Sequence, residues 1–315
     1  MTRDPLELLV LDQFFDLTLP EKISLINSLC CRRLWSEQLL AVWSSIAKRP
    51  LNSDQRMIIS RELIALAPWS KEAEEAFKIV LGEARPRTQQ LVDQVFMVIS
   101  CAKYMHKARH MLDALAGRLT PVFVVIGASE IRVARIDQNF LYVPAPDTYE
   151  GLPKKVFEGI LAIRQMFGPV RVVKVDDDLP VLVQHNSDAA KEFLSGIDYA
   201  GRPAGGEKFD RCWHIGKCAN PETLPYGRRY YGPWARGAIY ALSPTAIECI
   251  LREYLFYPGE MEGEYFEDKL VADMLRRCGI ELSYCDVGAL FGLLDTEEIA
   301  PAFLNDDWWA GEKLS

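Results

Sequence analysis

The sequence predicts an α/β domain with a largely parallel central sheet, preceded by an all-helical module. Three observations support this. Apolar residues follow a helical spacing over most of residues 1–117. From Thr120 onward, short β-branched runs alternate with helical segments. One of these runs ends in three consecutive aspartates. We therefore expect an α-helical bundle or solenoid-like module over residues 1–117 and an α/β domain over residues 118–315.

The helical module is predicted from successive amphipathic segments. Residues 21–34 and 35–47 place apolar side chains at helical spacing, and Ser53 and Ser70 are candidate N-caps. A further helix or two is predicted over residues 88–118. No tetratricopeptide signature is legible. The sequence leaves open whether the module recruits an acceptor, binds a protein partner or mediates self-association.

The α/β domain is predicted from strands that alternate with a helix. Residues 121–127, 141–143 and 170–175 are short runs rich in β-branched residues, which are typical of buried strands. Residues 152–167 carry apolar side chains at helical spacing. Strand, crossover helix and strand in this order indicate a parallel sheet, whose ligands bind beyond the carboxyl ends of the strands.

The aspartates Asp176, Asp177 and Asp178 follow the last of these strands. Carboxylates this close raise one another's pKa unless a cation compensates them. Oxygen ligands suit Mn²⁺ or Mg²⁺. Either ion is commonly bound by one or two carboxylates together with the phosphates of a substrate. The alternative is a solvated acidic turn or a helix cap.

A second acidic pair, Glu267 and Asp268, begins a predicted amphipathic helix. Acidic side chains in a first turn are favoured by the helix dipole, so capping alone explains them. The functional alternative is a general base that takes a proton from an acceptor hydroxyl. Both readings are compatible, because a capping position also fixes a carboxylate.

Between the two acidic segments lies an aromatic stretch, residues 230–243. Its flat side chains next to glycine and proline suit a sugar-binding loop, and glycine permits close backbone approach. Ordinary core packing is the alternative. The candidate substrate-binding residues are Tyr231, Trp234, Arg236 and Gly237.

Composition excludes several classes of protein. The chain carries a net charge of −8 without basic clusters, which disfavours a nucleic-acid partner. We expect no transmembrane segment, because no run approaches the roughly 20 apolar residues that span a bilayer. We expect no signal peptide, because residues 1–16 mix acidic with apolar side chains and lack a basic region followed by an apolar one. The eight cysteines are scattered. A cytoplasmic protein with reduced thiols is expected.

Four blocks resemble the β-1,3-galactosyltransferase and Fringe family of glycosyltransferases. They are Asp-Thr-Tyr-Glu-Gly-Leu-Pro-Lys-Lys at 147–155, Val-Lys-Val-Asp-Asp-Asp at 173–178, the aromatic block at 231–243, and Glu-Asp at 267–268. Their order and approximate spacing match the family over about residues 120–290. The helical module has no counterpart in this resemblance.

The resemblance implies a GT-A fold, in which a Rossmann-like nucleotide half joins an acceptor half. It implies inverting transfer from a UDP-sugar, with Mn²⁺ or Mg²⁺, to a glycan or glycoconjugate hydroxyl, and a β-1,3 linkage. By position, Asp178 is the metal ligand and Asp176 and Asp177 lie near ribose and diphosphate. Asp268 is the base, with Glu267 beside it. Lys155 and Lys174 fall at donor-side or structural lysines.

The chain departs from this family in its metal ligands. Members commonly supply a downstream histidine, but no histidine follows His214, and Asp286 or water is expected to complete the shell around Asp178 and Asp176. The usual arginine-rich block is reduced to Arg132 and Arg135. Most eukaryotic members are membrane-anchored, so a bacterial cytosolic relative or a trimmed luminal domain is expected.

Other interpretations remain open. The helical module is the functional part if the transferase domain is degenerate and the chain is a scaffold. A different nucleotide-sugar enzyme is a third option: a nucleotidyltransferase is disfavoured, because no glycine-rich basic loop follows the first strand, while a retaining transferase with the same fold stays open. Zinc ligation by Cys212, His214 and Cys218 lacks a second pair of ligands. A solvated or capping role is expected for His106 and His110. The residues left as either a donor flap or a packing patch are Trp308 and Trp309.

Overall fold

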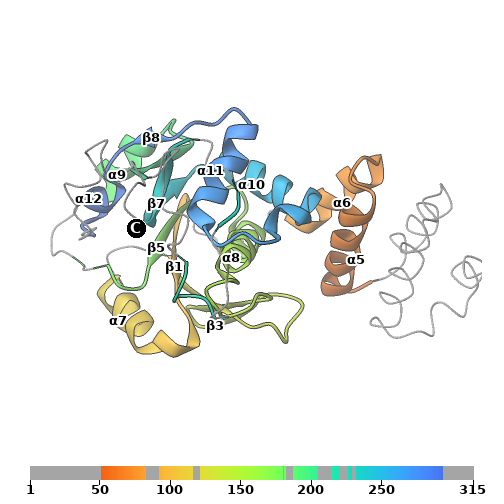
Figure 1. Ribbon diagram of the computed structural model, residues 1–315, viewed down its shortest axis with the longest axis horizontal. Coiled ribbons are helices and arrows are strands. Elements are labelled where there is room, and N and C mark those ends of the chain that lie inside the picture. Colours follow the sequence, from red (N-terminus) through yellow and green to blue (C-terminus); the bar gives the residue numbers. More distant parts are fainter. Residues whose placement is uncertain are drawn as a thin grey trace, which may run out of the picture. The chain divides into compact units, whose positions relative to one another are not determined.

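The computed structural model describes residues 51–82, 92–115, 121–179, 181, 187–204, 214–219, 226–228 and 232–293. The chain divides into two compact units (Figure 1). The first comprises Met1–Leu81 with Leu255–Tyr257, and the second comprises the remainder.

The described helices of the first unit before residue 82 are α5 (Ser53–Leu66) and α6 (Lys71–Leu81). The N-cap of α5 is Asn52, which accepts a hydrogen bond from Gln55 N at 2.8 Å, so the predicted cap at Ser53 is off by one residue. The Ser70 hydroxyl accepts from Ala73 N at 3.0 Å, and this predicted cap is confirmed.

The second unit is a mixed α/β domain around an eight-stranded sheet with the order β3-β4-β2-β1-β5-β7-β6-β8. Strands β4, β2, β1 and β5 are mutually parallel neighbours, and β7 runs antiparallel to β5 and β6. The strands are β1 (Gln94–Ile99), β2 (Val122–Gly127), β3 (Arg135–Asp137), β4 (Phe140–Val143), β5 (Arg171–Asp176), β6 (Tyr199–Ala204), β7 (Trp234–Leu242) and β8 (Ser283–Tyr284).

Helices cover both faces of this sheet (Figure 1). Helices α8 (Leu152–Phe167) and α11 (Glu267–Arg277) contact one face and each other. Helices α7 (Met105–Leu115), α9 (Ser187–Leu194) and α12 (Val287–Phe291) pack their apolar side chains against the other. The remaining helical elements of the described chain are η1 (Ala102–Tyr104), α10 (Pro244–Phe256) and η2 (Pro258–Met261).

The sheet's side chains alternate between these two layers, as a strand's period of two requires. Val124, Val173 and Ile239 belong to the cluster formed with α7, α9 and α12. On the opposite face, Gly159 of α8 lies so close to the sheet that a Cβ there would be 3.0 Å from Met97 Sδ. Each large apolar side chain buried in these layers stabilises the fold by roughly 1.5–3 kcal/mol.

Strands near 121–127, 141–143 and 170–175 and the helix at 152–167 are confirmed. Two predictions are wrong. Part of the region expected to be helical over 88–118 is β1, whose six residues are all buried between β2 and β5. The aromatic stretch is not a loop over 234–242 but strand β7, because its neighbours β5 and β6 pair with it on both edges.

The presence of β1 also places the boundary between the two units earlier in the chain than predicted. The two units separate between Leu81 and Gly82 rather than near residue 117, because β1 and α7 belong to the sheet domain. Among the described helices, none is both long and apolar enough to cross a membrane.

Candidate functional site

The aspartate triplet lies where the carboxyl ends of β1 and β5 meet. The register pairs Ile99 with Asp176, so the residues that follow them are also neighbours. Ser100 Oγ donates a hydrogen bond to Asp177 Oδ2 at 2.5 Å. Asp178, one residue farther, is exposed. The triplet therefore occupies the edge at which parallel sheets bind their ligands, as the sequence predicts.

A single buried lysine joins the triplet to the second acidic pair. Lys174 Nζ is 2.5 Å from Asp176 Oδ1 and 3.2 Å from Glu267 Oε1, and its exposed fraction is 1%. The same amino group donates to the Gly237 carbonyl of β7. Burial alone lowers the pKa of Lys174, but Asp176 and Glu267 outweigh burial and raise it. Lys174 is therefore a permanent cation that brings the two motifs to one place.

Glu267 is held from two sides. The hydroxyl of Tyr240 donates to Glu267 Oε2 at 3.0 Å, and Tyr240 is the cross-strand neighbour of Lys174. Because Glu267 is 2% exposed, burial raises its pKa, while Lys174 opposes that rise. A carboxylate fixed so completely inside the protein is a positioning group rather than one that moves with substrate.

Asp268 is the more accessible member of the pair and is half-buried. Its Oδ1 accepts from Lys269 N at 2.8 Å, and its carboxylate also accepts from the side chain of Trp234. Burial raises the pKa of Asp268, and these donors partly offset the rise. A raised pKa makes a carboxylate a stronger base, which suits it to accept a hydroxyl proton.

Gly237 lets this carboxylate lie against β7. A Cβ at Gly237 would be 3.2 Å from Asp268 Oδ2, so any side chain there presses on the carboxylate. The sequence predicts that Gly237 permits a close approach to the backbone. In the structure, the group that approaches it is the carboxylate of Asp268.

The cluster carries an excess of negative charge. Burial raises the pKa of Asp176 to about 6 against the lowering effect of Lys174, although its side chain keeps 40% exposure. Lys174 acts on the carboxylates of Asp176, Glu267 and Asp268, and Lys107 acts on Asp177, so the carboxylates outnumber the lysines that face them. Such an excess favours a bound cation.

The carboxylates at the strand end fit a magnesium-type site better than a closed protein cage. In the described part of the chain, no three His, Cys, Asp or Glu side chains form a group that could hold a metal ion. Mg²⁺ and Mn²⁺ need only one or two carboxylates when substrate phosphates and water complete the shell. Asp178 and Asp176 fit that requirement.

The third expected ligand has another role in the structure. Asp286 is the N-cap of α12 and accepts from Ala289 N at 2.9 Å. Its carboxylate stabilises that helix terminus.

The two lysines at donor-side or structural positions both face protein partners. Lys155 Nζ lies 2.6 Å from Asp147 Oδ1 and donates to Ser100 O at 2.8 Å. Asp147 in turn accepts from the backbone N–H groups of Ala102 and Gly127. Lys155 therefore ties α8 to the ends of β1 and β2. Both lysines favour the structural alternative.

The predicted substrate residues divide into three groups. Trp234 is 2% exposed, so its role as a sugar-binding surface is wrong, and it serves Asp268 instead. Arg236 and Gly237 are half-buried on β7. Tyr231 lies outside the described residues.

The remaining candidates are exposed, are buried among aromatic side chains, or fall outside the description. His106 and His110 are exposed on α7. His214 is buried and stacks on Tyr265 with ring centroids 4.3 Å apart. The residues that fall outside the described ranges are Cys212, Trp308 and Trp309.

Three residues of the site were not among the sequence candidates. Ser100 was missed because the strand that it follows was predicted to be helical. Tyr240 lies within the aromatic block of residues 231–243, where nothing in the sequence singles it out, and its hydroxyl holds Glu267. Tyr149 has a raised pKa, first from burial and then from Asp268. A polar residue directly after an apolar run is the signal that could have identified Ser100.

Comparison with known proteins identifies no family for this chain. No family model matches it, and no curated protein does. A solved structure, 4-diphosphocytidyl-2C-methyl-D-erythritol synthase from Anaerococcus prevotii, matches 68% of this chain and 99% of its own, at 13% identity and a TM-score of 0.35. A likeness of this degree supports no argument about function, so the Fringe-like resemblance rests on the four sequence blocks alone.

Proposed function

We propose that this protein is a metal-dependent glycosyltransferase that moves sugar from a UDP-sugar to a hydroxyl of a glycan or glycoconjugate, with inversion and a β-1,3 linkage. The observation that supports this best is the Lys174 bridge between Asp176 and Glu267. Two acidic motifs that the family resemblance pairs only by sequence order share one buried counter-ion.

Donor binding is assigned to the end of β5. Asp178 and Asp176 would hold Mn²⁺ or Mg²⁺, and the ion would supply positive charge beside the leaving diphosphate. Asp177, fixed by Ser100, lies on the ribose and diphosphate side. Lys174 keeps Asp176 in position and supplies a buried positive charge beside it.

Proton removal is assigned to Asp268. Its carboxylate is held by Lys269 N and Trp234 against β7, which fixes it before the acceptor arrives. Such preorganisation lowers the entropic part of the barrier. Glu267 is a positioning residue, because it touches Lys174 and Tyr240 rather than solvent.

The experiment that tests this proposal measures UDP release from UDP-galactose, UDP-N-acetylglucosamine and UDP-N-acetylgalactosamine, with water or a mixture of simple glycosides as acceptor. Release from one donor that requires Mn²⁺ or Mg²⁺ and stops in EDTA is the expected result. Release of no UDP from any donor, by a protein that also fails to bind these donors, would overturn the proposal in favour of a scaffold with a degenerate transferase domain.

A further inference from the structure

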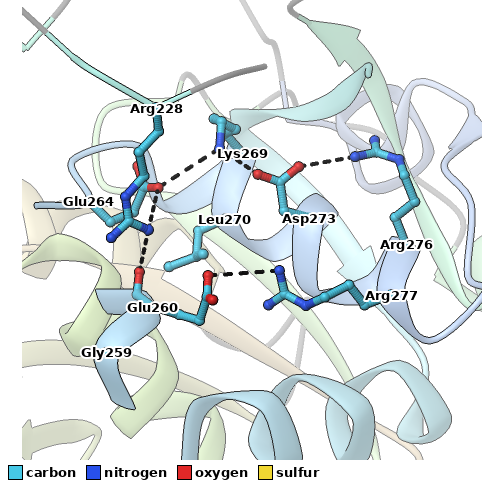
Figure 2. Close-up of a pocket in the computed structure, with 9 residues that line it drawn as sticks. All are labelled: Arg228, Gly259, Glu260, Glu264, Lys269, Leu270, Asp273, Arg276 and Arg277. Atoms are coloured by element: carbon cyan, nitrogen blue, oxygen red, sulfur yellow. Dashed lines mark hydrogen bonds and ion pairs between the residues drawn. The ribbon is translucent and has the colours of Figure 1, made fainter. Parts of the chain in front are cut away.

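A second site lies on the opposite side of α11 from the carboxylate cluster. A pocket of about 590 Å³ opens between α11, η2 and the segment around Arg228 (Figure 2). This volume lies in the range of sites for small molecules. The residues that line it are Arg228, Gly259, Glu260, Glu264, Lys269, Leu270, Asp273, Arg276 and Arg277.

The charges of this pocket are arranged in two layers. The inner layer is buried: Glu264 and Asp273 flank Lys269, whose amino group pairs with both carboxylates. The outer layer consists mainly of guanidinium groups, with exposed fractions of 41% for Arg277, 32% for Arg228 and 25% for Arg276. Glu260 is the one pocket-lining carboxylate in the outer layer, among the described residues.

Neighbouring carboxylates fix these arginines in place, and Arg277 is held by Glu253, whose Oε2 lies 2.6 Å from Arg277 Nε. Asp273 Oδ1 lies 3.0 Å from Arg276 Nη1, and Glu264 Oε2 lies 3.6 Å from Arg228 Nη1. Arg228 also donates to the backbone carbonyls of Glu260 and Glu262. Side chains held in this way lose little conformational freedom when a ligand binds.

The geometry points to a binding site for the phosphate group of a phosphorylated ligand, held between Arg228 on one side and Arg276 and Arg277 on the other. Figure 2 shows the first arginine and the other two on opposite sides of Leu270. A guanidinium has five N–H donors in a planar fork, so it can hold a protein carboxylate and a ligand oxygen together. A phosphate offers enough oxygens for three arginines, whereas a carboxylate has two.

The charge of the whole chain strengthens this assignment. A protein of net charge −8 repels anions in general, whereas the lining of this pocket has four cationic side chains and three carboxylates. Glu253 and Glu281 pair with Arg277 and Arg276 from outside the lining. The pocket is separate from the donor-binding site. Glu267 and Asp268 point from α11 toward Tyr240 and Gly237 of β7, on the side of the helix away from the pocket. Either a soluble phosphate ester or the headgroup of an anionic phospholipid supplies this chemistry.

The test is calorimetric titration of the full chain with inorganic phosphate in EDTA, beside sodium acetate. The native protein is expected to bind phosphate and not acetate. The double variant Arg228→Gln/Arg277→Gln is expected to weaken binding by at least about tenfold, because charge-assisted hydrogen bonds are lost. The matched control is Arg56→Gln, which removes an exposed arginine of α5. Undiminished phosphate binding by the double variant, or equal binding of acetate, overturns the assignment.

Two further variants make the test independent of folding defects and of the proposed catalysis. Glu260→Gln removes the exposed carboxylate and is expected to tighten phosphate binding, whereas weaker binding contradicts the model. Asp178→Ala is expected to bind phosphate as the native protein does. A loss there would place the anion in the carboxylate site instead.

Sedimentation with vesicles distinguishes the source of the phosphate. Vesicles of phosphatidylcholine with phosphatidylglycerol that retain the native protein but not Arg228→Gln/Arg277→Gln would identify a lipid headgroup. Binding of inorganic phosphate with no vesicle binding would identify a soluble phosphate ester. Binding of neither probe overturns the site.

Discussion

The two sides of α11 are electrostatic opposites. On the β7 side the buried counter-ion is a cation, Lys174, and it holds the carboxylate of Asp176, which is 40% exposed. On the pocket side the buried set carries two carboxylates, Glu264 and Asp273, and the exposed charge is largely guanidinium. In each region the buried ions hold exposed groups of opposite sign, and the exposed groups determine which ligand the region attracts.

This difference explains why adjacent residues of one short helix have unrelated roles. Asp268 and Lys269 are neighbours in sequence, yet a helix directs them about 100° apart. Asp268 lies against Gly237 of β7, while Lys269 pairs with Glu264 and Asp273. The helix is therefore a wall shared by two sites, which can be altered one at a time.

The largest expected effect comes from Asp268→Asn, which removes the base and keeps the size of the side chain. Transfer is expected to fall by about 10²- to 10⁴-fold, the usual contribution of a general base. Metal-dependent donor binding and phosphate binding in the pocket are expected to persist. Initial rates together with donor titrations check this, and full turnover by the variant would show that Asp268 is not the base.

The next largest effect is expected on stability, from Lys174→Met. Removing the buried cation leaves Glu267 and Asp176 uncompensated, and breaking a buried pair typically costs about 3–5 kcal/mol. Urea unfolding at neutral pH measures the loss. The double variant Lys174→Met/Glu267→Gln is expected to recover part of it. If the two single losses simply add in the double variant, Lys174 and Glu267 are not coupled.

A smaller effect is expected from Gly237→Ala. The added methyl lies 3.2 Å from Asp268 Oδ2, so the carboxylate must shift by a few tenths of an ångström. We expect turnover to fall about tenfold, because misplaced catalytic groups lose rate, with little change in donor affinity. The matched control is Gly227→Ala, where a Cβ meets no atom within 4 Å. Equal rates in both variants would show that the contact between Gly237 and Asp268 does not affect catalysis.

The smallest effect is expected in the pH profile. The base acts as the ionised carboxylate, so kcat/KM is lost as pH falls through the pKa of Asp268. Burial raises that pKa, which places the acid limb above the ordinary aspartate value of about 4. A profile measured with saturating metal checks the direction. An acid limb at or below the ordinary value would show that the base is solvated.

The sequence predicted those parts of the fold that depend on local pattern. The run at 170–175, the aspartates after it and the helix that begins at Glu267 are all where the pattern indicates. A strand buried on both faces of a parallel sheet is apolar throughout, so its sequence lacks the alternation of a half-buried strand. For this reason the sequence of β1 resembles that of a buried helix. Because β1 was not predicted, Ser100, which follows it and holds Asp177, was not predicted either.

Contacts between distant segments were not visible in the sequence. Residues 173–178 alone do not predict that Lys174 is buried or that it pairs with Glu267. Both features depend on β7 lying beside β5 in the folded sheet. The arginine pocket was missed for the same reason. Arg228 is far in sequence from Arg276 and Arg277, and only the fold brings them to one pocket.

The most direct test of the central claim is thermal unfolding of the native protein and Asp178→Ala with a panel of UDP-sugars, with and without Mn²⁺. A ligand that binds only the folded state raises the midpoint. We expect a shift for one UDP-sugar that needs Mn²⁺ and disappears in Asp178→Ala. A shift that is equal without metal, or that survives in Asp178→Ala, would contradict it.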